Sequence, residues 1–578
     1  MTASASRPPG RIAAFARSAE QWSNEHPAFL FVALTAWYVA LIWHLIRRPL
    51  WFDELSTFYI AQQPTVSRMM EAIRTVDLNP PLSYFLTRWS MAAFGASPWG
   101  ARLPGAIAFW GGSVAIFALL RRRASSLIAA LGVLLFWCTP YFPYAAEARP
   151  YGLLLGLSAI LLAGWDTAAF GRRKLGLTTV FVAAILLLLS HLFGTLSLGA
   201  VWVGEAVRSW RRRKLDLPML AVLLLPLLAT ITYRPIFHTF QTGVFPPESQ
   251  ASWNKLYFLY FAVFRWMSRP LLAIGLIALF TWRRRQRVFR EMIERKPYRQ
   301  ETRYVTTPPY LEGTFALPMC VTLTLLFLVP LGLTILFMRS HGAFFDRYGM
   351  VAVLPIVLLV PLLLARRWTR FSASASFGAF CCVAFLLLLS TALRAPLTVA
   401  ASTILPPHAA NKATRYLATS PYGPFRPWWK ALAVPEPLLQ ERAQAPLIPS
   451  LDAFHPDLPL VAGNELTFVE MDNHESDVLT HRLFYLYDRQ AEVAIAHRSA
   501  ANSILKMKNF FPLRGTIAPY ASFVSKHRRF LVLALYEHSG DWLLRKLEAD
   551  GATLQIIGRA DGYADTDLYL VTYPTPAQ

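Results

Sequence analysis

Long apolar runs are the feature that most constrains the fold of this chain. Many of them extend over about 17 to 23 residues, which is enough for a helix to cross the hydrocarbon core of a bilayer. Charged residues make up only 16% of the 578 residues, against roughly a quarter in an ordinary soluble domain. The pattern predicts an all-α polytopic membrane protein with about 11 transmembrane helices. These cover residues 29–46, 103–120, 124–141, 151–170, 175–193, 194–210, 217–233, 257–282, 315–337, 348–365 and 371–393.

The net charge of +23 follows the same organisation. A basic chain can bind nucleic acid, but here the basic residues lie in short loops between apolar runs, as the positive-inside rule describes. We therefore expect no nucleic-acid partner, a cytoplasmic N-terminus and a periplasmic or extracellular C-terminal part. Arg47 and Arg48 are the exception, because they fall on the outer side. The clusters assigned to the cytoplasmic side are 121–123, 172–174, 211–214, 283–287 and 366–370.

This orientation depends on residues 80–95, which are apolar but do not have the pattern of a span. Leu82, Phe85 and Trp89 recur on one helical face, whereas Ser83 and Thr87 lie on another. The segment has only about fifteen residues, which is short for a transmembrane helix. We predict a helix lying in the membrane surface, preceded by a similar one at residues 66–76.

The chain is predicted to have four parts. A cytoplasmic leader (1–28) precedes a transmembrane domain (29–394), whose first outer loop is 47–102. A connector rich in proline and aromatic residues (395–457) leads to a small extracytoplasmic α/β domain (458–578). The elements expected there are strands at 458–463, 528–537, 552–560 and 567–574, and a helix at 541–551 that ends on a glycine.

Asp53 and Glu54 follow the first predicted span on its outer side. Carboxylates in the first turn of a helix interact favourably with the helix dipole, and this alone accounts for them. Alternatively, one of them is a general base and the other orients it or the substrate. Adjacent residues of a helix do not face the same way, so the two carboxylates should have different roles.

Other polar residues are predicted at the same outer surface, and each has a structural alternative. Glu147 and Arg149 could cap the next helix, or they could belong to a site. Arg102 and Arg347 could extend their head groups to water, or they could bind a lipid phosphate. His191, at the end of an apolar run, is either a helix-end residue or a base.

The order of these motifs resembles that of a known family. Along the chain come "DE" at 53–54, "DLNPPLSYFL" at 77–86, "ARLPGA" at 101–106, "EARPY" at 147–151, His191 and "RY" at 347–348. This order resembles the GT-C glycosyltransferases that use lipid-phosphate sugars. Within them it is similar to the protein O-mannosyltransferase and aminoarabinose transferase group, particularly the RgtA/B/C/D-like branch. The resemblance covers residues 29–393 and departs from many relatives at Ser83, where they have tyrosine.

The resemblance implies an inverting transfer of a sugar from a polyprenyl-phosphate donor to an acceptor hydroxyl of a lipid, a glycan or a protein. The reaction would take place at the outer face of a bacterial inner or plasma membrane. The family's base maps onto Asp53, with Glu54 beside it, its phosphate-binding arginine onto Arg102, and its second acid onto Glu147. The remaining substrate-binding candidates are Asn79, Arg149, Tyr151, His191, Arg347 and Tyr348. No cofactor is assigned, and a divalent metal stays open because only some enzymes of this kind use one.

Three other kinds of protein compete with this interpretation. A transporter or flippase of polyprenol-linked sugars would place charges within its spans and have pseudo-symmetric halves. A polymerase or ligase would carry its key groups in a large late loop. A membrane anchor for the C-terminal domain would leave the outer polar residues unexplained.

Overall fold

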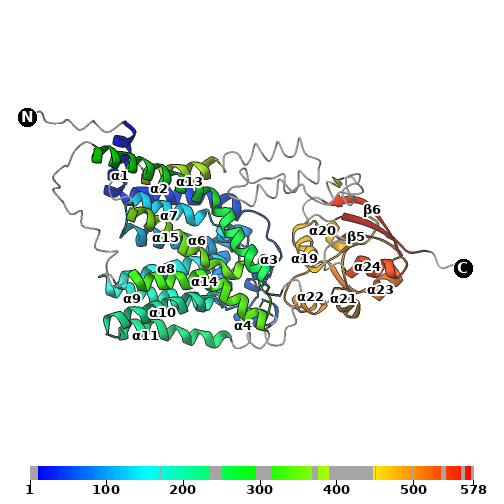
Figure 1. Ribbon diagram of the computed structural model, residues 1–578. Coiled ribbons are helices and arrows are strands. Elements are labelled where there is room, and N and C mark those ends of the chain that lie inside the picture. Colours follow the sequence, from blue (N-terminus) through cyan, green and yellow to red (C-terminus); the bar gives the residue numbers. More distant parts are fainter. Residues whose placement is uncertain are drawn as a thin grey trace, which may run out of the picture. The chain divides into compact units, whose positions relative to one another are not determined.

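The computed structural model of the chain divides into two compact units (Figure 1). The first comprises Met1–Ile46, Arg102–Arg234 and Ser249–Thr391, and the second comprises Arg47–Ala101, Pro235–Glu248 and Ala392–Gln578. Within them the structure describes residues 11–77, 79–169, 171–233, 250–294, 316–340, 342–367, 375–389, 447–448, 451–452, 454–496, 500–534, 542–560 and 567–574. Residues 1–10 of the predicted leader and most of the predicted connector lie outside the described residues.

The described part of the first unit consists of helices. Helices α8, α9 and α10 lie side by side, and α14 packs against α10 (Figure 1). The helices are α1 (Arg11–Glu25), α2 (Pro27–Ile46), α6 (Pro98–Arg121), α7 (Ser126–Trp137), α8 (Tyr151–Ala169), α9 (Arg173–Ser190), α10 (Gly194–Arg212), α11 (Leu217–Leu224), α13 (Trp253–Glu294), α14 (Ala316–Ser340), α15 (Val353–Arg367) and an unlabelled helix, Ala375–Leu389. Three 3₁₀ segments are η2 (Phe142–Ala146), η3 (Leu225–Tyr233) and η5 (Asp346–Ala352).

Six helices of the described residues are long and apolar enough to cross a membrane, and the bent pair α1–α2 would make seven. A polytopic membrane protein is thus confirmed, but the predicted number of eleven spans is not. Helix α7 and the helical segments at 217–233 and 375–389 are shorter than a span, and α10 carries Glu205 and Arg208. All twelve residues of α7 are buried inside the unit, so its apolar composition serves packing between helices.

Glycines bring α6 and α8 into close contact. A Cβ atom added at Gly156 of α8 would lie 2.0 Å from the Ala108 carbonyl oxygen of α6, and one at Gly112 would lie 2.8 Å from the Gly156 Cα. A Cβ at Gly105 would lie 3.1 Å from the Glu147 carbonyl oxygen. Helices with small residues in register can approach this closely. The packing therefore sets the start of α6 beside the segment that precedes α8.

Arginines in or near the basic clusters interpreted as signals of topology also bind buried carboxylates. Asp166 of α8 is fully buried and forms ion pairs with Arg122 and Arg123. Arg208 of α10 bridges two more carboxylates, with Nε 2.8 Å from Glu205 Oε2 and Nη2 2.6 Å from Asp216 Oδ2. These arginines therefore have a structural function within the bundle in addition to any effect on topology.

The second unit contains a mixed seven-stranded sheet with the strand order β1-β6-β7-β5-β2-β3-β4. Strand β2 pairs in parallel with β3 and β5, whereas β7 is antiparallel to β5 and β6. The strands are β1 (Leu447–Ile448), β2 (Leu460–Ala462), β3 (Leu483–Tyr487), β4 (Thr516–Pro519), β5 (Arg529–Ala534), β6 (Thr553–Ala560) and β7 (Asp567–Thr572). The helices between them are α19 (Glu465–His474), α20 (Asp477–His481), α21 (Arg489–Ala496), α22 (Ala501–Lys508), α23 (Tyr520–Lys526) and α24 (Trp542–Ala549).

The strands and the helix expected from the C-terminal sequence correspond to β2, β5, α24, β6 and β7. Helix α24 ends before Gly551, whose φ of +82° is the left-handed conformation that glycine adopts most readily after a helix. Strands β1, β3 and β4 were not predicted. Strands β1 and β4 have only two and four residues, so their apolar pattern is weak, whereas β3 is a run of five apolar or aromatic residues that the sequence could have revealed.

The first outer loop belongs to the second unit, whereas the sequence assigned it to the transmembrane domain. It forms α3 (Phe52–Ala61), α4 (Val66–Ala72), the π-helix η1 (Ile73–Asp77) and α5 (Leu82–Phe94). The reason is apolar burial, since Leu55, Tyr59 and Ile60 of α3 share one core with the strand residues Leu460 and Leu483. Neighbouring strand residues point to the opposite face of the sheet, where α23 and α24 cover a second core.

Helix α5 has the character predicted for a surface helix. It has thirteen residues and does not reach the length of a span. Its Ser83, Tyr84 and Thr87 face the interior of the second unit, while Trp89 is exposed. The polar face is therefore buried, and the apolar face is only partly exposed, because Phe85 also packs against the core of the second unit.

Candidate functional site

Polar and aromatic side chains gather where η2, α8 and η5 meet in the first unit. The Tyr151 ring lies 5.2 Å from that of Tyr144 and 5.5 Å from that of His191, between ring centroids. The Arg347 guanidinium lies over Tyr151, with Cζ 5.6 Å from the ring centroid. We refer to the following residues as the aromatic–basic cluster: Tyr144, Tyr151, His191, Arg347 and Tyr348.

Glu147 adds a negative charge to this cluster. It follows η2 directly and has an extended backbone conformation. Burial, followed by the negative charge of Glu147, raises the pKa of the Tyr144 phenol, while the positive charge of Arg347 lowers it. Tyr144 therefore keeps its proton at neutral pH and can donate a hydrogen bond. An acid, a cation and a phenol thus lie together at one end of the bundle.

His191 is held at the end of α9 by its backbone and its ring. Its Nδ1 accepts a hydrogen bond from the Phe193 backbone N–H at 3.1 Å. In the neutral ring the proton must then be on Nε2. The Phe193 ring also contacts Tyr348, with 4.6 Å between centroids, and so connects His191 to η5.

Two arginines of this region are buried. Arg102 is only 1% exposed, and its Nη1 donates to the Ile46 carbonyl oxygen at 3.0 Å. Arg149, between Glu147 and the start of α8, is 7% exposed. Gly105, one turn after Arg102 on α6, touches the Glu147 backbone. The described contacts therefore place α6 and the "EARPY" segment against each other, as a shared phosphate site would require.

Asp53 and Glu54 start α3 in the second unit. Glu54 is fully buried, and its Oε2 accepts a hydrogen bond from the Trp51 backbone N–H at 3.3 Å. Asp53 is half-buried at the next position. The two carboxylates thus differ in environment, as adjacent helical positions should, and Glu54 has the geometry of a capping residue.

Asn79 lies close to the carboxylate of Asp77, which was not among the predicted site residues. Its Nδ2 is 3.1 Å from Asp77 Oδ1, and the Tyr84 hydroxyl donates to Asp77 Oδ2 at 2.7 Å. Asp77, Asn79 and Tyr84 all belong to the "DLNPPLSYFL" motif. The motif itself could have identified Asp77, because its carboxylate is followed within seven residues by two side chains able to donate hydrogen bonds to it, Asn79 and Tyr84.

The predicted site residues therefore fall into two groups. Glu147, Tyr151, His191, Arg347 and Tyr348 lie together in the first unit, and Arg102 and Arg149 belong to the same unit. A second group lies in the first loop of the second unit, with Asp53 and Glu54 in α3 and Asn79 between η1 and α5. A single site formed by both groups stays a prediction.

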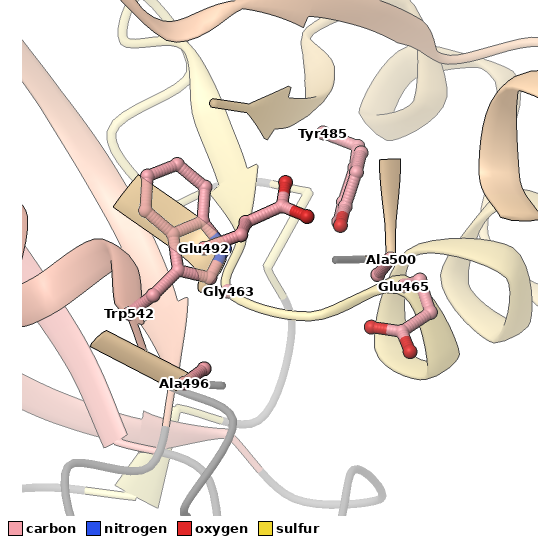
Figure 2. A pocket seen from close by; sticks show the side chains of 7 residues that line it. All are labelled: Gly463, Glu465, Tyr485, Glu492, Ala496, Ala500 and Trp542. Atoms are coloured by element: carbon pink, nitrogen blue, oxygen red, sulfur yellow. The ribbon is translucent and has the colours of Figure 1, made fainter. Parts of the chain in front are cut away.

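No cluster of three or more His, Cys, Asp or Glu side chains able to hold a metal ion is found among the described residues. A small recess lies beyond the carboxyl end of β2 in the second unit (Figure 2). Its volume of about 10 Å³ is room for roughly one water molecule, too little for a sugar. It is lined by Gly463, Glu465, Tyr485, Glu492, Ala496, Ala500 and Trp542.

The fold of this chain is similar to that of membrane proteins with solved structures. The chain is similar to ArnT from Cupriavidus metallidurans in the apo state, with a TM-score of 0.50 and 15% identity over 96% of this chain and 100% of that chain. The same protein bound to undecaprenyl phosphate gives a TM-score of 0.49 and 15% identity over 95% and 99% of the two chains. An oligosaccharyltransferase from Archaeoglobus fulgidus, in a complex with Zn and sulfate, gives 0.28 and 12% identity over 79% of this chain and 59% of that chain.

The likeness to apo ArnT shows a shared fold and supports the predicted GT-C fold. At 15% identity it does not define a reaction or a branch of the family. No family model matches the chain, and no curated protein matches it significantly.

Proposed function

We propose that the protein is an integral-membrane glycosyltransferase that moves a sugar from a polyprenyl-phosphate donor to an acceptor hydroxyl at the outer membrane face. The observation that carries the proposal is the association of Glu147 with Arg347 and three aromatic rings at one end of an apolar helical bundle. Charged groups are costly in such a bundle and usually mark a site. The fold shared with apo ArnT, together with the order of motifs from Asp53 to Tyr348, supports this class of enzyme.

Asp53 is the proposed base. As the acceptor oxygen attacks the anomeric carbon, its proton passes to the Asp53 carboxylate. The bond between the anomeric carbon and the phosphate oxygen breaks on the opposite side of the sugar, so the configuration is inverted. The polyprenyl phosphate leaves with the bonding electron pair.

Arg102 is the proposed ligand of that phosphate. The negative charge of the phosphate increases as the sugar–phosphate bond breaks, and the buried Arg102 guanidinium stabilises this charge with planar, paired donors. Arg149 and Arg347 supply further positive charge, while Glu147, Tyr151 and His191 are proposed to bind sugar hydroxyls. Tyr348 and Asn79 complete the proposed substrate contacts.

The orientation is proposed from the charge bias of the loops, with a cytoplasmic N-terminus and a periplasmic or extracellular C-terminal α/β part. From the resemblance to GT-C enzymes we place the protein in a bacterial inner or plasma membrane. The acceptor is a lipid, a glycan or a protein. The RgtA/B/C/D-like branch remains the proposed relationship within the family.

A transporter or polymerase of polyprenol-linked saccharides is the alternative. Transport needs charged groups along a path through the spans. The buried Asp166 and Glu205 do not form such a path, because Asp166 is paired with Arg122 and Arg123, and Glu205 is paired with Arg208. The described residues therefore favour a transferase.

The test is to offer labelled polyprenyl-phosphate sugars and a mixture of envelope acceptors to the purified full chain and to its Asp53→Asn variant. Wild type should release polyprenyl phosphate and label an acceptor, while Asp53→Asn should lose about 100- to 10,000-fold in rate, the range for removing a general base. Full activity in Asp53→Asn would overturn the assignment of the base. Movement of intact donor across vesicles without transfer would favour the transporter.

A further inference from the structure

One face of α19, in the C-terminal part of the second unit, contacts the start of the first-loop helix α3. Glu470 Oε1 accepts a hydrogen bond from the Phe52 backbone N–H at 3.0 Å. His474 Nε2 lies 2.6 Å from the Leu50 carbonyl oxygen, and Asn473 Nδ2 donates to the Tyr59 hydroxyl at 2.7 Å. Positions 470, 473 and 474 are spaced to share one helical face. We refer to Glu470, Asn473 and His474 as the α19 clamp.

The opposite face of α19 is fixed in the core of the sheet. Phe468, Val469 and Met471 are fully buried, and the Phe468 ring lies 5.7 Å from that of Tyr485 in β3. The C-terminal turn is held by Asp472, whose Oδ1 accepts from the backbone N–H groups of Arg514 and Gly515 at 2.9 and 2.6 Å. A helix anchored in this way is a rigid support for whatever its outer face binds.

Helix α3 needs such a support. It has only ten residues, and an isolated helix of that length is marginal in water. Its first N–H groups have no partner within the helix, and Glu470 binds the one at Phe52. The end of α3 is also held from the same side, because Gln63 Nε2 donates to the Phe510 carbonyl oxygen at 2.7 Å.

We propose that Glu470, Asn473 and His474 are positioning residues for catalysis, which orient the first turn of α3 and with it the carboxylate of Asp53. The C-terminal α/β part thus supports the first loop that carries Asp53. The inference rests on the proposed function, in which Asp53 is the base. A base must hold its place to within about an ångström, so loosening this turn should lower kcat more than it weakens donor binding.

The kinetic test compares Glu470→Ala, Glu470→Gln and Leu466→Ala in the full chain. Glutamine keeps an oxygen that can accept from Phe52, whereas alanine does not. Leu466 lies on the same helix with an exposed side chain and is the matched control. We expect kcat to fall about 10- to 100-fold in Glu470→Ala, with donor KM within about twofold, and to stay near wild type in the other two. Wild-type kcat in Glu470→Ala, or an equal loss in Glu470→Gln, would overturn the inference.

Hydrogen exchange tests the clamp without relying on the reaction. In Glu470→Ala the amides of residues 52–55 should exchange about tenfold faster, as expected when a hydrogen bond worth about 1.4 kcal/mol is lost, while β2 and β5 stay protected. Unchanged exchange in α3 would refute the clamp whatever Asp53 does. If Asp53→Asn keeps full activity while α3 exchange rises, the proposed base is wrong and the clamp stands as a structural contact.

A second pair of variants covers the case in which Glu470→Ala does not fold. Asn473→Ala and Tyr59→Phe remove the two partners of one hydrogen bond. If that bond positions α3, the loss of kcat in the double variant should equal the loss in either single variant. Additive losses, or none, would remove Asn473 from the clamp.

Discussion

The Glu54 carboxylate accepts a hydrogen bond from the backbone N–H of Trp51, with 3.3 Å between the nitrogen and Oε2. This bond joins the side chain of the third helical residue to the backbone just before the helix, and it satisfies a donor that the helix itself cannot satisfy. Glu54 is fully buried, whereas its neighbour Asp53 is half-buried. The relationship therefore divides the acid pair into a capping residue and a candidate base.

The first prediction concerns this division. Glu54→Gln keeps an acceptor for Trp51 and should retain kcat within about threefold, because only the charge is removed. Glu54→Ala loses the cap and should lower the free energy of unfolding by about 1 kcal/mol. Initial rates and thermal unfolding of the purified protein measure both effects. A folded Glu54→Gln variant that is as inactive as Asp53→Asn would assign the base to Glu54.

The second prediction concerns Arg102. Because lysine cannot make the planar, paired contact of a guanidinium, Arg102→Lys should raise donor KM about tenfold, and Arg102→Gln should raise it further. Loss of the bond to Ile46 should also cost stability, about 1 kcal/mol or more. Rates over a range of donor concentrations measure the donor KM, and thermal unfolding measures the stability.

Arg121→Lys is the control for Arg102, because Arg121 ends the same helix and donates to the Asn24 carbonyl oxygen. It should leave donor KM at the wild-type value. An unchanged KM in Arg102→Gln would contradict the phosphate assignment and favour an arginine that only caps α2.

The third prediction concerns the contact between α6 and α8. An alanine Cβ at Gly156 would meet the Ala108 carbonyl oxygen at 2.0 Å, so the helices must separate. Overpacking of this kind costs about 1–3 kcal/mol, and it should also reduce activity by moving Arg102 away from the "EARPY" segment. Gly199→Ala in α10 is the matched control, since nothing lies within 4 Å of an added Cβ there. Equal melting temperatures for the two variants would contradict the close packing.

Local pattern was enough for some of this architecture. The 3.6-residue period predicted helices at 66–76 and 80–95, and helices are present there as α4–η1 and α5; that they lie in the membrane surface stays a prediction. Local pattern could not show where they pack. The bond between Phe52 and Glu470 joins residues 418 positions apart, and nothing in either segment alone encodes that contact.

An apolar run can serve two purposes, and composition alone does not separate them. The run at 124–141 was predicted to be a span because it is apolar; the helix found there, α7, is shorter than a span and wholly buried among other helices, so that span is not confirmed. Basic clusters were interpreted only as signals of topology for a similar reason. Their partners Asp166, Glu205 and Asp216 are isolated acids in the sequence, and only the packing of neighbouring helices brings them together.

The fourth prediction concerns Arg208. Arg208→Met leaves the carboxylates of Glu205 and Asp216 with one cation fewer in a buried region, which should cost about 3–5 kcal/mol. Adding Glu205→Gln should recover much of this, because glutamine keeps an acceptor for the Trp165 Nε1–H without a charge. Thermal unfolding in detergent measures both, with Arg211→Ala, on the exposed side of α10, as a control with little effect. A larger loss in the double variant than in Arg208→Met would contradict the charge argument.

The fifth prediction concerns pH. The hydrogen bond from Arg173, with further bonds from the Met219 backbone and Arg208, outweighs burial and lowers the pKa of Asp216 from 3.8 to about 2. A carboxyl whose pKa is lower in the folded state stabilises the fold fully above its unfolded pKa, and this stabilisation is lost as the pH falls through the folded pKa. The shift corresponds to about 2 kcal/mol. The difference in stability between wild type and Asp216→Asn should therefore be constant above about pH 5 and shrink between pH 4 and pH 2.

Thermal unfolding at several pH values measures this difference. Glu71→Gln is a suitable control, because its ion pair with Arg68 is exposed and surface pairs contribute about 0–1 kcal/mol. Its difference from wild type should be small at every pH. If the Asp216→Asn difference were the same at pH 6 and pH 2.5, the contribution of Asp216 would come from its shape and neutral hydrogen bonds, because a contribution from its ionised carboxylate must disappear once that group is protonated in the folded state.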